Sequence, residues 1–115
     1  MTAKALKNLF KLSHKVSVYC PTLQVDGEAC DNWADKTASL LASLFGGSTS
    51  TDAVGYWILS KTGKLQKESV RLVFSYAEEL TDVAIDSIYQ HAVEMKTACK
   101  QDAVAIEVDG DLFFI

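Results

Sequence analysis

The spacing of the apolar residues alternates along this chain between two periods, and the order of those periods limits most strongly how it can fold. In residues 16–20 the apolar side chains recur at every second position, which is typical of a strand with one buried face. Between residues 33 and 45 they recur every three or four positions, which predicts an amphipathic helix. Asp31 or Asn32 can cap the start of this helix, and Gly46 stands where a left-handed C-terminal cap would lie.

The second half of the chain repeats this change of period. Residues 54–60 alternate again, and a turn that contains Gly63 leads back into residues 65–76, within which the residues from Val70 to Tyr76 alternate. This pattern predicts a β-hairpin. Thr81 can cap a second helix, whose predicted buried stripe consists of Ile85, Ile88, Ala92, Met95 and Cys99. Residues 103–108 then alternate as a strand does, and Asp109-Gly110 predicts a tight turn into a last strand.

The predicted order of elements is therefore β-α-β-β-α-β, followed by one more strand. This order predicts an α+β fold of the ferredoxin-like split βαβ type, with both helices on one face of an antiparallel sheet. At 115 residues the chain has the length of one ordinary domain. We expect residues 13–115 to form the α+β body and residues 1–12 to form a basic amphipathic arm with a short helix.

Charge is unevenly distributed along the chain. Residues 1–15 hold four lysines and no acid, whereas the remaining residues hold 7 basic and 15 acidic side chains. An acidic body repels phosphate backbones at long range, and a single arginine, Arg71, offers little bidentate phosphate or base recognition. Nucleic-acid binding is therefore disfavoured. The arm is expected to lie on the body, and the alternative is contact with an acidic partner through Lys4, Lys7 and Lys11.

Neither a membrane span nor a secretory signal is predicted. No run approaches the roughly 20 apolar residues that a membrane helix needs, and the first 20 residues carry lysines throughout. A cytoplasmic protein is the expectation from these features. Cys20, Cys30 and Cys99 are odd in number and widely spaced, so we expect three reduced thiols. No metal site and no cofactor are predicted.

One segment raises the question of a ligand-binding loop: LFGGSTSTDAVGYW, residues 44–57. Phosphate-binding loops place their glycines before a helix, where free N–H groups face the anion. Here Gly46 and Gly47 follow a helix, which predicts a helix stop and then a polar turn at STST. The alternative is a binding surface where hydroxyl groups lie beside aromatic rings. Its candidate residues are Ser48, Thr49, Ser50, Thr51, Tyr56, Trp57, Phe74 and Tyr76.

No catalytic residue is predicted. The run Asp109-Gly110-Asp111 resembles a fragment of a calcium loop but lacks the other ligands, so a turn is the expected structure. His14 and His91 have no paired nucleophile near them in the sequence, and a surface or half-buried position is expected for His91.

Three segments together resemble a group of small uncharacterised bacterial proteins carried on plasmids, phages and other mobile elements. They are residues 44–57, the hairpin TGKLQKESVRLVFSY and the C-terminal DGDLFFI. The resemblance covers about residues 8–115, is most specific in residues 44–57, and brings no activity or catalytic residues with it. It implies an accessory protein of a mobile element, a class in which inhibitors of host defence enzymes recur.

Two functions follow as hypotheses. The first is a non-enzymatic protein-interaction module, such as an inhibitor of a host defence or nucleic-acid-processing effector. A sheet with helices on one face leaves an open face that pairs with a protein partner or forms a homodimer. The outward aromatic set on that face is either Tyr19 and Trp57, with Leu59, or Tyr56, Phe74 and Tyr76. The alternative is a small-molecule-binding regulator or small enzyme on a dimeric ferredoxin-like scaffold.

Overall fold

The computed structural model describes residues 3–23, 30 and 32–115. A single 3-10 turn, η1 (Lys4–Leu6), precedes five strands and two helices. These elements are β1 (His14–Pro21), α1 (Trp33–Phe45), β2 (Thr49–Ile58), β3 (Leu65–Ala77), α2 (Asp82–Ala98), β4 (Ala105–Val108) and β5 (Asp111–Phe114). Most of the loop expected over residues 21–30 lies outside the described residues.

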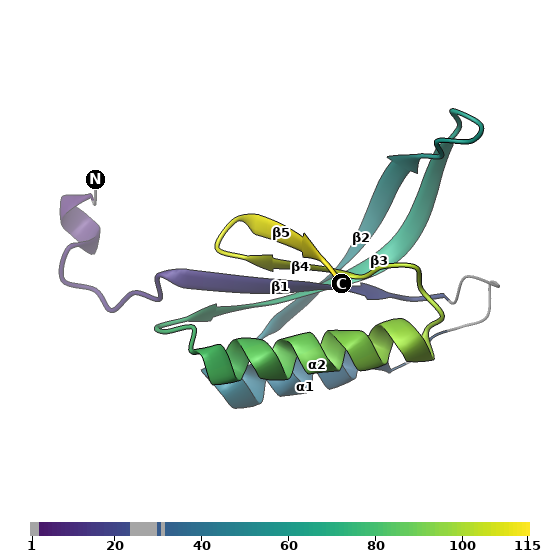
Figure 1. The fold of residues 1–115 in the computed structure, drawn as a ribbon. Coiled ribbons are helices and arrows are strands. Elements are labelled where there is room, and N and C mark those ends of the chain that lie inside the picture. Colours follow the sequence, from purple (N-terminus) through teal and green to yellow (C-terminus); the bar gives the residue numbers. More distant parts are fainter. Residues whose placement is uncertain (1–2, 24–29, 31) are drawn as a thin grey trace.

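The five strands form one antiparallel sheet. Their order is β2-β3-β1-β4-β5, and every neighbouring pair is antiparallel. Figure 1 shows α1 and α2 side by side on one face of this sheet, while the β2–β3 hairpin extends beyond the helices. The predicted α+β fold with a split βαβ arrangement is confirmed, and β5 is the additional C-terminal strand.

The core lies between the helices and the central strands. Val16 and Val18 of β1, Leu41 of α1 and Ile88 of α2 are fully buried. Alternate residues of β1 and every third or fourth residue of the helices meet in this layer, as the two periods predict. Each aliphatic side chain of this size contributes roughly 1.5–3 kcal/mol through burial.

The helix ends follow the expected capping chemistry in part. Gly46 has a φ of 95°, and its N–H donates to the carbonyl of Ala42 at 2.7 Å, so the left-handed cap predicted there is confirmed. The hydroxyl of Thr81 accepts a hydrogen bond from the N–H of Ala84 at 3.1 Å, as predicted for α2. Asn32 precedes α1 in a left-handed conformation without a capping bond from its side chain, and Asp31 lies outside the described residues.

The polar turn predicted at STST is wrong for its last three residues. Strand β2 begins at Thr49, where it pairs with Phe74, and Thr51 pairs with Leu72. Threonine is β-branched and suits a strand, and at a sheet edge its hydroxyl still reaches water. The apolar alternation that predicted the strand starts only at residue 54, because residues 49–52 are all polar.

The helix predicted within residues 1–12 is also wrong beyond one turn. Among residues 3–12, which the structure describes, only Lys4–Leu6 forms helix-like structure, and it has no buried residue. A short helix is marginal in water unless an apolar face packs against the body, and residues 3–12 are all exposed. The part of the arm before Phe10 therefore does not lie on the body as expected, and Figure 1 shows it extending away from the sheet.

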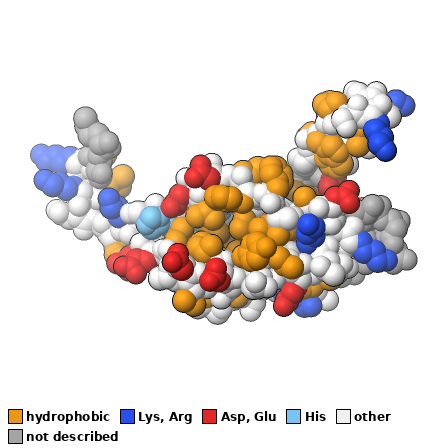
Figure 2. Space-filling view, in the orientation of Figure 1, with side chains coloured by type: hydrophobic (Ala, Val, Ile, Leu, Met, Phe, Trp, Pro, Cys, Tyr) orange, Lys and Arg blue, Asp and Glu red, His pale blue; other side chains and the backbone are white. Residues whose placement is uncertain are grey.

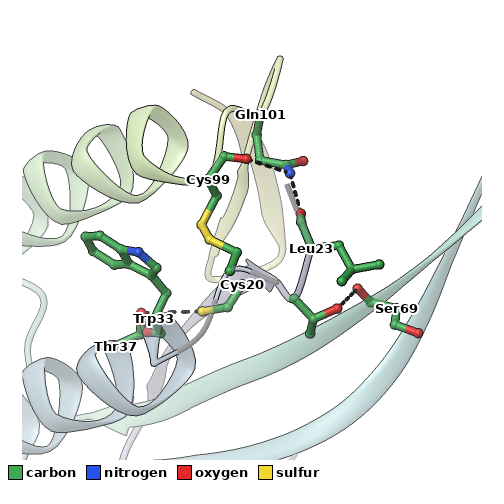
Figure 3. Close-up of a disulfide and its surroundings, with 9 residues drawn as sticks. Cys20, Leu23, Trp33, Thr37, Ser69, Cys99 and Gln101 are labelled. Carbon is green, nitrogen blue, oxygen red and sulfur yellow. Dashed lines mark hydrogen bonds between the residues drawn. A yellow bond between two sulfur atoms is a disulfide. The ribbon is translucent and has the colours of Figure 1, made fainter. Parts of the chain in front are cut away.

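The prediction of three reduced thiols is wrong for two of them. Cys30 and Cys99 form a disulfide across 69 residues of sequence, with their Cα atoms 5.6 Å apart. Figure 3 shows this bond at the end of α2, with the thiol of Cys20 close by but not part of it. Spacing along the sequence did not indicate this pairing because the segment before α1 and the end of α2 meet only in the folded chain.

No helix in the described part of the chain combines the length and the apolar character that crossing a membrane requires.

Candidate functional site

The helix-free face of the sheet is the first candidate surface. Val73 and Ser75 of β3 are buried on the helix side, so Phe74 and Tyr76 between and beyond them point to the open face. Residues that pair directly across two strands share a face. The register therefore puts further predicted binding residues on the open face: Thr49, Thr51 and Trp57.

Two predicted binding residues lie on the opposite face. Ser50 pairs with Val73, which is buried on the helix side, and Tyr56 lies an even number of residues further along β2. Tyr19 pairs with Leu72, so it shares the open face with Trp57, Phe74 and Tyr76. The open face thus combines members of both aromatic sets considered from the sequence, without Tyr56.

A cavity of about 760 Å³ lies where β2 begins and β3 ends. Ser48 and Thr49 line it on one side, and Phe74 and Tyr76 line it on the other. Four of the eight predicted binding residues therefore meet around one hollow, whose volume falls in the range of ligand-binding pockets. The remaining wall consists of Phe10, Leu12, Leu44, Phe45, Gly46, Gly47, Ser75, Ala77, Glu78 and Glu79.

Hydrogen bonds from two serines hold the loop at the mouth of this cavity. The hydroxyl of Ser48 donates to the carbonyl of Ala38 at 2.8 Å, which ties the loop to α1. The hydroxyl of Ser75 donates to the carbonyl of Gly47, which ties the same loop to β3. A loop held from both sides keeps its shape before any ligand arrives, so less ordering entropy is lost on binding.

The charges around the cavity favour a positively charged group. Glu78 and Glu79 contribute exposed carboxylates, and the C-terminal carbonyls of α1 add the negative end of the helix dipole. The rings of Phe74 and Tyr76 meet edge to face, with their centroids 6.1 Å apart. The ammonium of Lys15 already lies 4.9 Å from the Phe74 centroid, a distance typical of cation–π contact.

Sequence reasoning missed the two glutamates and the arm residues of this site. Glu78 and Glu79 precede the start of a helix, where acids are stabilising in any fold, so their position alone does not indicate a ligand site. A usable signal was present, because both acids lie within three residues of Tyr76, the last aromatic residue of β3. Phe10 and Leu12 could not be assigned to the site from the sequence, because nothing in their spacing shows where the arm leaves the body.

Glu68 is a second candidate group on the open face. Partial burial raises the pKa of its carboxyl group, which is the direction expected of a proton-transfer residue. It stands opposite Gly55, where no side chain competes for space. Six residues separate it from Phe74, or roughly 20 Å along a strand. One small ligand in the cavity therefore does not reach Glu68 within the same chain.

His91, Thr37 and Cys20 form a buried link between α2, α1 and β1. The Thr37 hydroxyl donates to the carbonyl of Trp33 at 2.7 Å, and it accepts from His91 Nε2 at 2.7 Å and from Cys20 Sγ at 3.4 Å. Burial lowers the pKa of His91 and raises the pKa of Cys20 to about 11. A neutral imidazole and a protonated thiol suit packing between layers, and such a thiol is a poor nucleophile.

The calcium-loop fragment forms the predicted turn. The carboxylate of Asp109 accepts from His14 Nδ1 at 2.7 Å and from the Lys15 N–H at 2.9 Å. These two hydrogen bonds lower the pKa of Asp109 and tie the β4–β5 turn to the start of β1. Among the described residues, no group of three or more His, Cys, Asp or Glu side chains could hold a metal ion.

These features define a ferredoxin-like α+β chain with an aromatic and acidic cavity, and two solved structures share its fold. One is a phage SAM lyase in complex with S-methyl-5'-thioadenosine, with a TM-score of 0.66 and 14% sequence identity. The similarity covers 96% of this chain and 94% of that chain. The other is a phage SAM lyase in the apo state, with a TM-score of 0.59, 15% identity, and coverage of 95% and 93% of the two chains. No family model and no curated protein match the sequence.

The prediction of a non-enzymatic interaction module is contradicted by this comparison. The chains that share the fold over nearly their whole length are lyases, which are enzymes. The prediction rested on an open sheet face and on the lack of a catalytic motif in the sequence. Neither observation excludes an enzyme, because groups that are far apart in sequence can assemble into a site without forming a motif.

Proposed function

We propose that this chain is a small enzyme that binds S-adenosylmethionine and cleaves it to S-methyl-5'-thioadenosine. The single observation that carries the proposal is the aromatic and acidic cavity, found in a chain whose fold is that of a phage SAM lyase. Identity of 14% supports the fold alone, so the assignment of the ligand depends on the chemistry of the cavity.

The cavity has a complement for each part of this ligand. The Lys15 ammonium lies over one face of the Phe74 and Tyr76 rings, and the opposite faces suit the adenine and the sulfonium cation. The hydroxyl of Thr49 suits the ribose hydroxyl groups, and Glu78 and Glu79 suit the ammonium of the amino-acid part. Lys15 does not line the cavity, but its ammonium lies 4.9 Å from the centroid of the Phe74 ring, which does, and it suits the carboxylate.

The proposed reaction needs no nucleophile from the protein. The carboxylate of the substrate attacks its own γ-carbon, the C–S bond breaks, and sulfur keeps the electron pair as a neutral thioether. The four-carbon fragment closes to a lactone, so atoms and charge balance without water. Positive charge disappears from sulfur in this step, and apolar walls such as Phe45 and Phe74 favour it by replacing water around the sulfonium. The chain's residues therefore act by orienting the ligand and excluding water.

The test is incubation of the protein with S-adenosylmethionine and chromatographic detection of S-methyl-5'-thioadenosine. We expect Tyr76→Ala to lower kcat/KM about tenfold, since a cation–π contact in a partly desolvated site contributes up to about 2 kcal/mol. Lys61→Gln, in the exposed β2–β3 turn, is the matched control and should leave the rate unchanged. Absence of product, together with no rise in melting temperature with S-methyl-5'-thioadenosine, would contradict the proposal.

A second variant tests whether the reaction takes place at the cavity or at Glu68. Glu68→Gln removes the carboxyl with the raised pKa and preserves the shape of the side chain. If the cavity is the site, this variant keeps the rate within about twofold, while Glu78→Gln/Glu79→Gln raises KM. A rate loss in Glu68→Gln with normal kinetics in the double variant would move the site to the middle of the β2–β3 hairpin.

The wider setting is also a proposal. We place the chain among accessory proteins of mobile elements, in keeping with its resemblance to such proteins, and the phage origin of both structural neighbours supports this. We further propose a homodimer through the open sheet face, supported by the exposed ring of Trp57 there and by the half-exposed Tyr76. Sedimentation of Trp57→Ser tests it, because loss of that ring should weaken the dimer.

A further inference from the structure

The first part of the N-terminal arm is an exposed amphipathic segment without an apolar surface beneath it. Leu6 is 55% exposed and Leu9 is 62% exposed. Phe10 and Leu12 line the cavity, so the segment before them is the part that extends away from the body in Figure 1. Contact of exposed leucine side chains with water is unfavourable, and exposed apolar segments of this kind usually have a docking surface.

The charge of the arm restricts what it can dock on. Lys4, Lys7 and Lys11 recur at spacings of three and four residues, and residues 1–15 contain no acid. All 15 acidic residues of the chain lie beyond this segment. An apolar surface bordered by carboxylates would therefore complement the arm in both respects.

The body presents such a surface between β5 and α2. Figure 2 shows hydrophobic side chains gathered there, with carboxylates along the border. Phe113 pairs with Ile106, which faces the core, yet Phe113 is 50% exposed because α2 does not cover it. Tyr89 of α2 is 45% exposed. The acidic residues on α2 and at the start of β5 include Asp82, Asp86 and Asp111.

We propose that the arm of one copy of this chain docks on the β5–α2 surface of a second copy. Leu6 and Leu9 would cover Phe113 and Tyr89, while the lysines of the arm face the acidic border. The second copy is favoured because the chain itself carries both complementary surfaces, and its own arm points away from its own β5–α2 surface. Exchange of a terminal segment between identical chains needs little change of either fold.

A charge exchange in the full-length chain tests this pairing by analytical ultracentrifugation without ligand. All variants carry Trp57→Ser as well, so that the open-face dimer proposed above does not contribute. Lys4→Glu/Lys7→Glu should weaken self-association at least tenfold, and Asp82→Lys/Asp86→Lys should do the same. The two variants mixed together should associate, since the reversed arm then meets the reversed surface. The matched control, Lys61→Glu/Lys64→Glu, reverses two exposed lysines in the β2–β3 turn and should associate as the Trp57→Ser chain does.

Three outcomes would overturn the proposal. One is a wild-type chain that stays monomeric at all concentrations up to about a millimolar, which exceeds the Kd of even weak specific complexes. Another is a Trp57→Ser chain that stays monomeric, or whose association the charge reversals do not change. The third is failure of the mixed variants to associate. Since no ligand is present, each outcome is independent of the proposed enzymatic activity.

Discussion

The two halves of β3 differ both in sequence pattern and in surroundings. Near its end, Val73 is fully buried between the sheet and the helices. Near its start, Leu65 is 61% exposed, and its partner on β2, Ile58, is also 61% exposed. Apolar residues alternate only in the second half, because residues 66–69 are all polar, and α1 and α2 lie beneath the second half alone (Figure 1).

This difference shows that a segment can form a strand without being covered, while the layer of helices decides how much the strand contributes to the stability of the fold. Burial at Val73 and its neighbours stabilises the fold, whereas apolar side chains at the hairpin tip stay in water and contribute little. Stability is thus concentrated in the helix-covered half. The hairpin, the arm and the cavity at their border are free to carry residues chosen for binding.

The largest expected effect on stability comes from a substitution in the core of the helix-covered half. Leu41→Ala should lower the free energy of unfolding by about 2–5 kcal/mol, because a fully buried leucine leaves a cavity in the core. Ile58→Ala, at the exposed hairpin, should change it by less than about 0.5 kcal/mol. Urea denaturation measures both. Similar losses for the two variants would mean that the hairpin is covered in solution, as in a dimer.

The next effect concerns the disulfide that holds the end of the covered half. Breaking the Cys30–Cys99 bond by a reducing agent should cost about 2–4 kcal/mol, since it closes a long loop. A thermal melt with and without the reductant measures this loss. The variant Cys30→Ser/Cys99→Ser is the control and should melt at one temperature in both conditions. A wild-type melting temperature that ignores the reductant would indicate that the bond does not stabilise the fold.

Much of the fold could be predicted because its signals are local. Strand and helix periods, the Gly46 and Thr81 caps and the Asp109-Gly110 turn all depend on residues close in sequence. The start of β2 was misplaced because Thr49 pairs through its backbone with β3, and the polar side chains of residues 49–52 do not show this. The disulfide depends on the meeting of two distant segments, which no local pattern encodes.

The candidate site was predictable only in part, for the same physical reason. Hydroxyl and aromatic residues in one segment and one strand suggested a binding surface, and Ser48 and Phe74 do meet at the cavity. Glu78 joins them only because β3 ends beside the start of β2. Assigning the aromatic residues to the helix-free face requires knowing whether the helices cover the odd-numbered or the even-numbered residues of β3. The alternation in the sequence does not show which of the two is covered.

A smaller effect sharpens the comparison inside the covered half. Thr37→Val keeps the shape of a fully buried side chain but removes the oxygen that accepts from His91 and Cys20. Leaving those donors without this partner should cost about 1–3 kcal/mol. Thr51→Val, on the exposed strand β2, is the matched control and should be nearly neutral or slightly stabilising. Equal effects in urea denaturation would show that the buried link adds no stability.

The smallest expected effect is the pH dependence that this link creates. Burial lowers the pKa of His91 below its ordinary value of 6.5, against the carboxylate of Glu94, which raises it, while Lys36 lowers it further. The unfolded chain then binds a proton more readily than the folded chain does. The stabilisation is complete above pH 6.5 and is lost as the pH falls through the lower pKa of the folded state.

Unfolding free energies measured between about pH 7.5 and pH 5.5 should therefore decrease as acid is added, and the raised pKa of Glu68 acts in the opposite direction. This pH window lies above the ordinary pKa range of carboxyl groups, so Asp109, whose pKa is lowered further, does not contribute to the slope. His91→Gln should flatten the slope in this window. A slope that His91→Gln leaves unchanged would place the pH sensitivity outside the link of His91, Thr37 and Cys20.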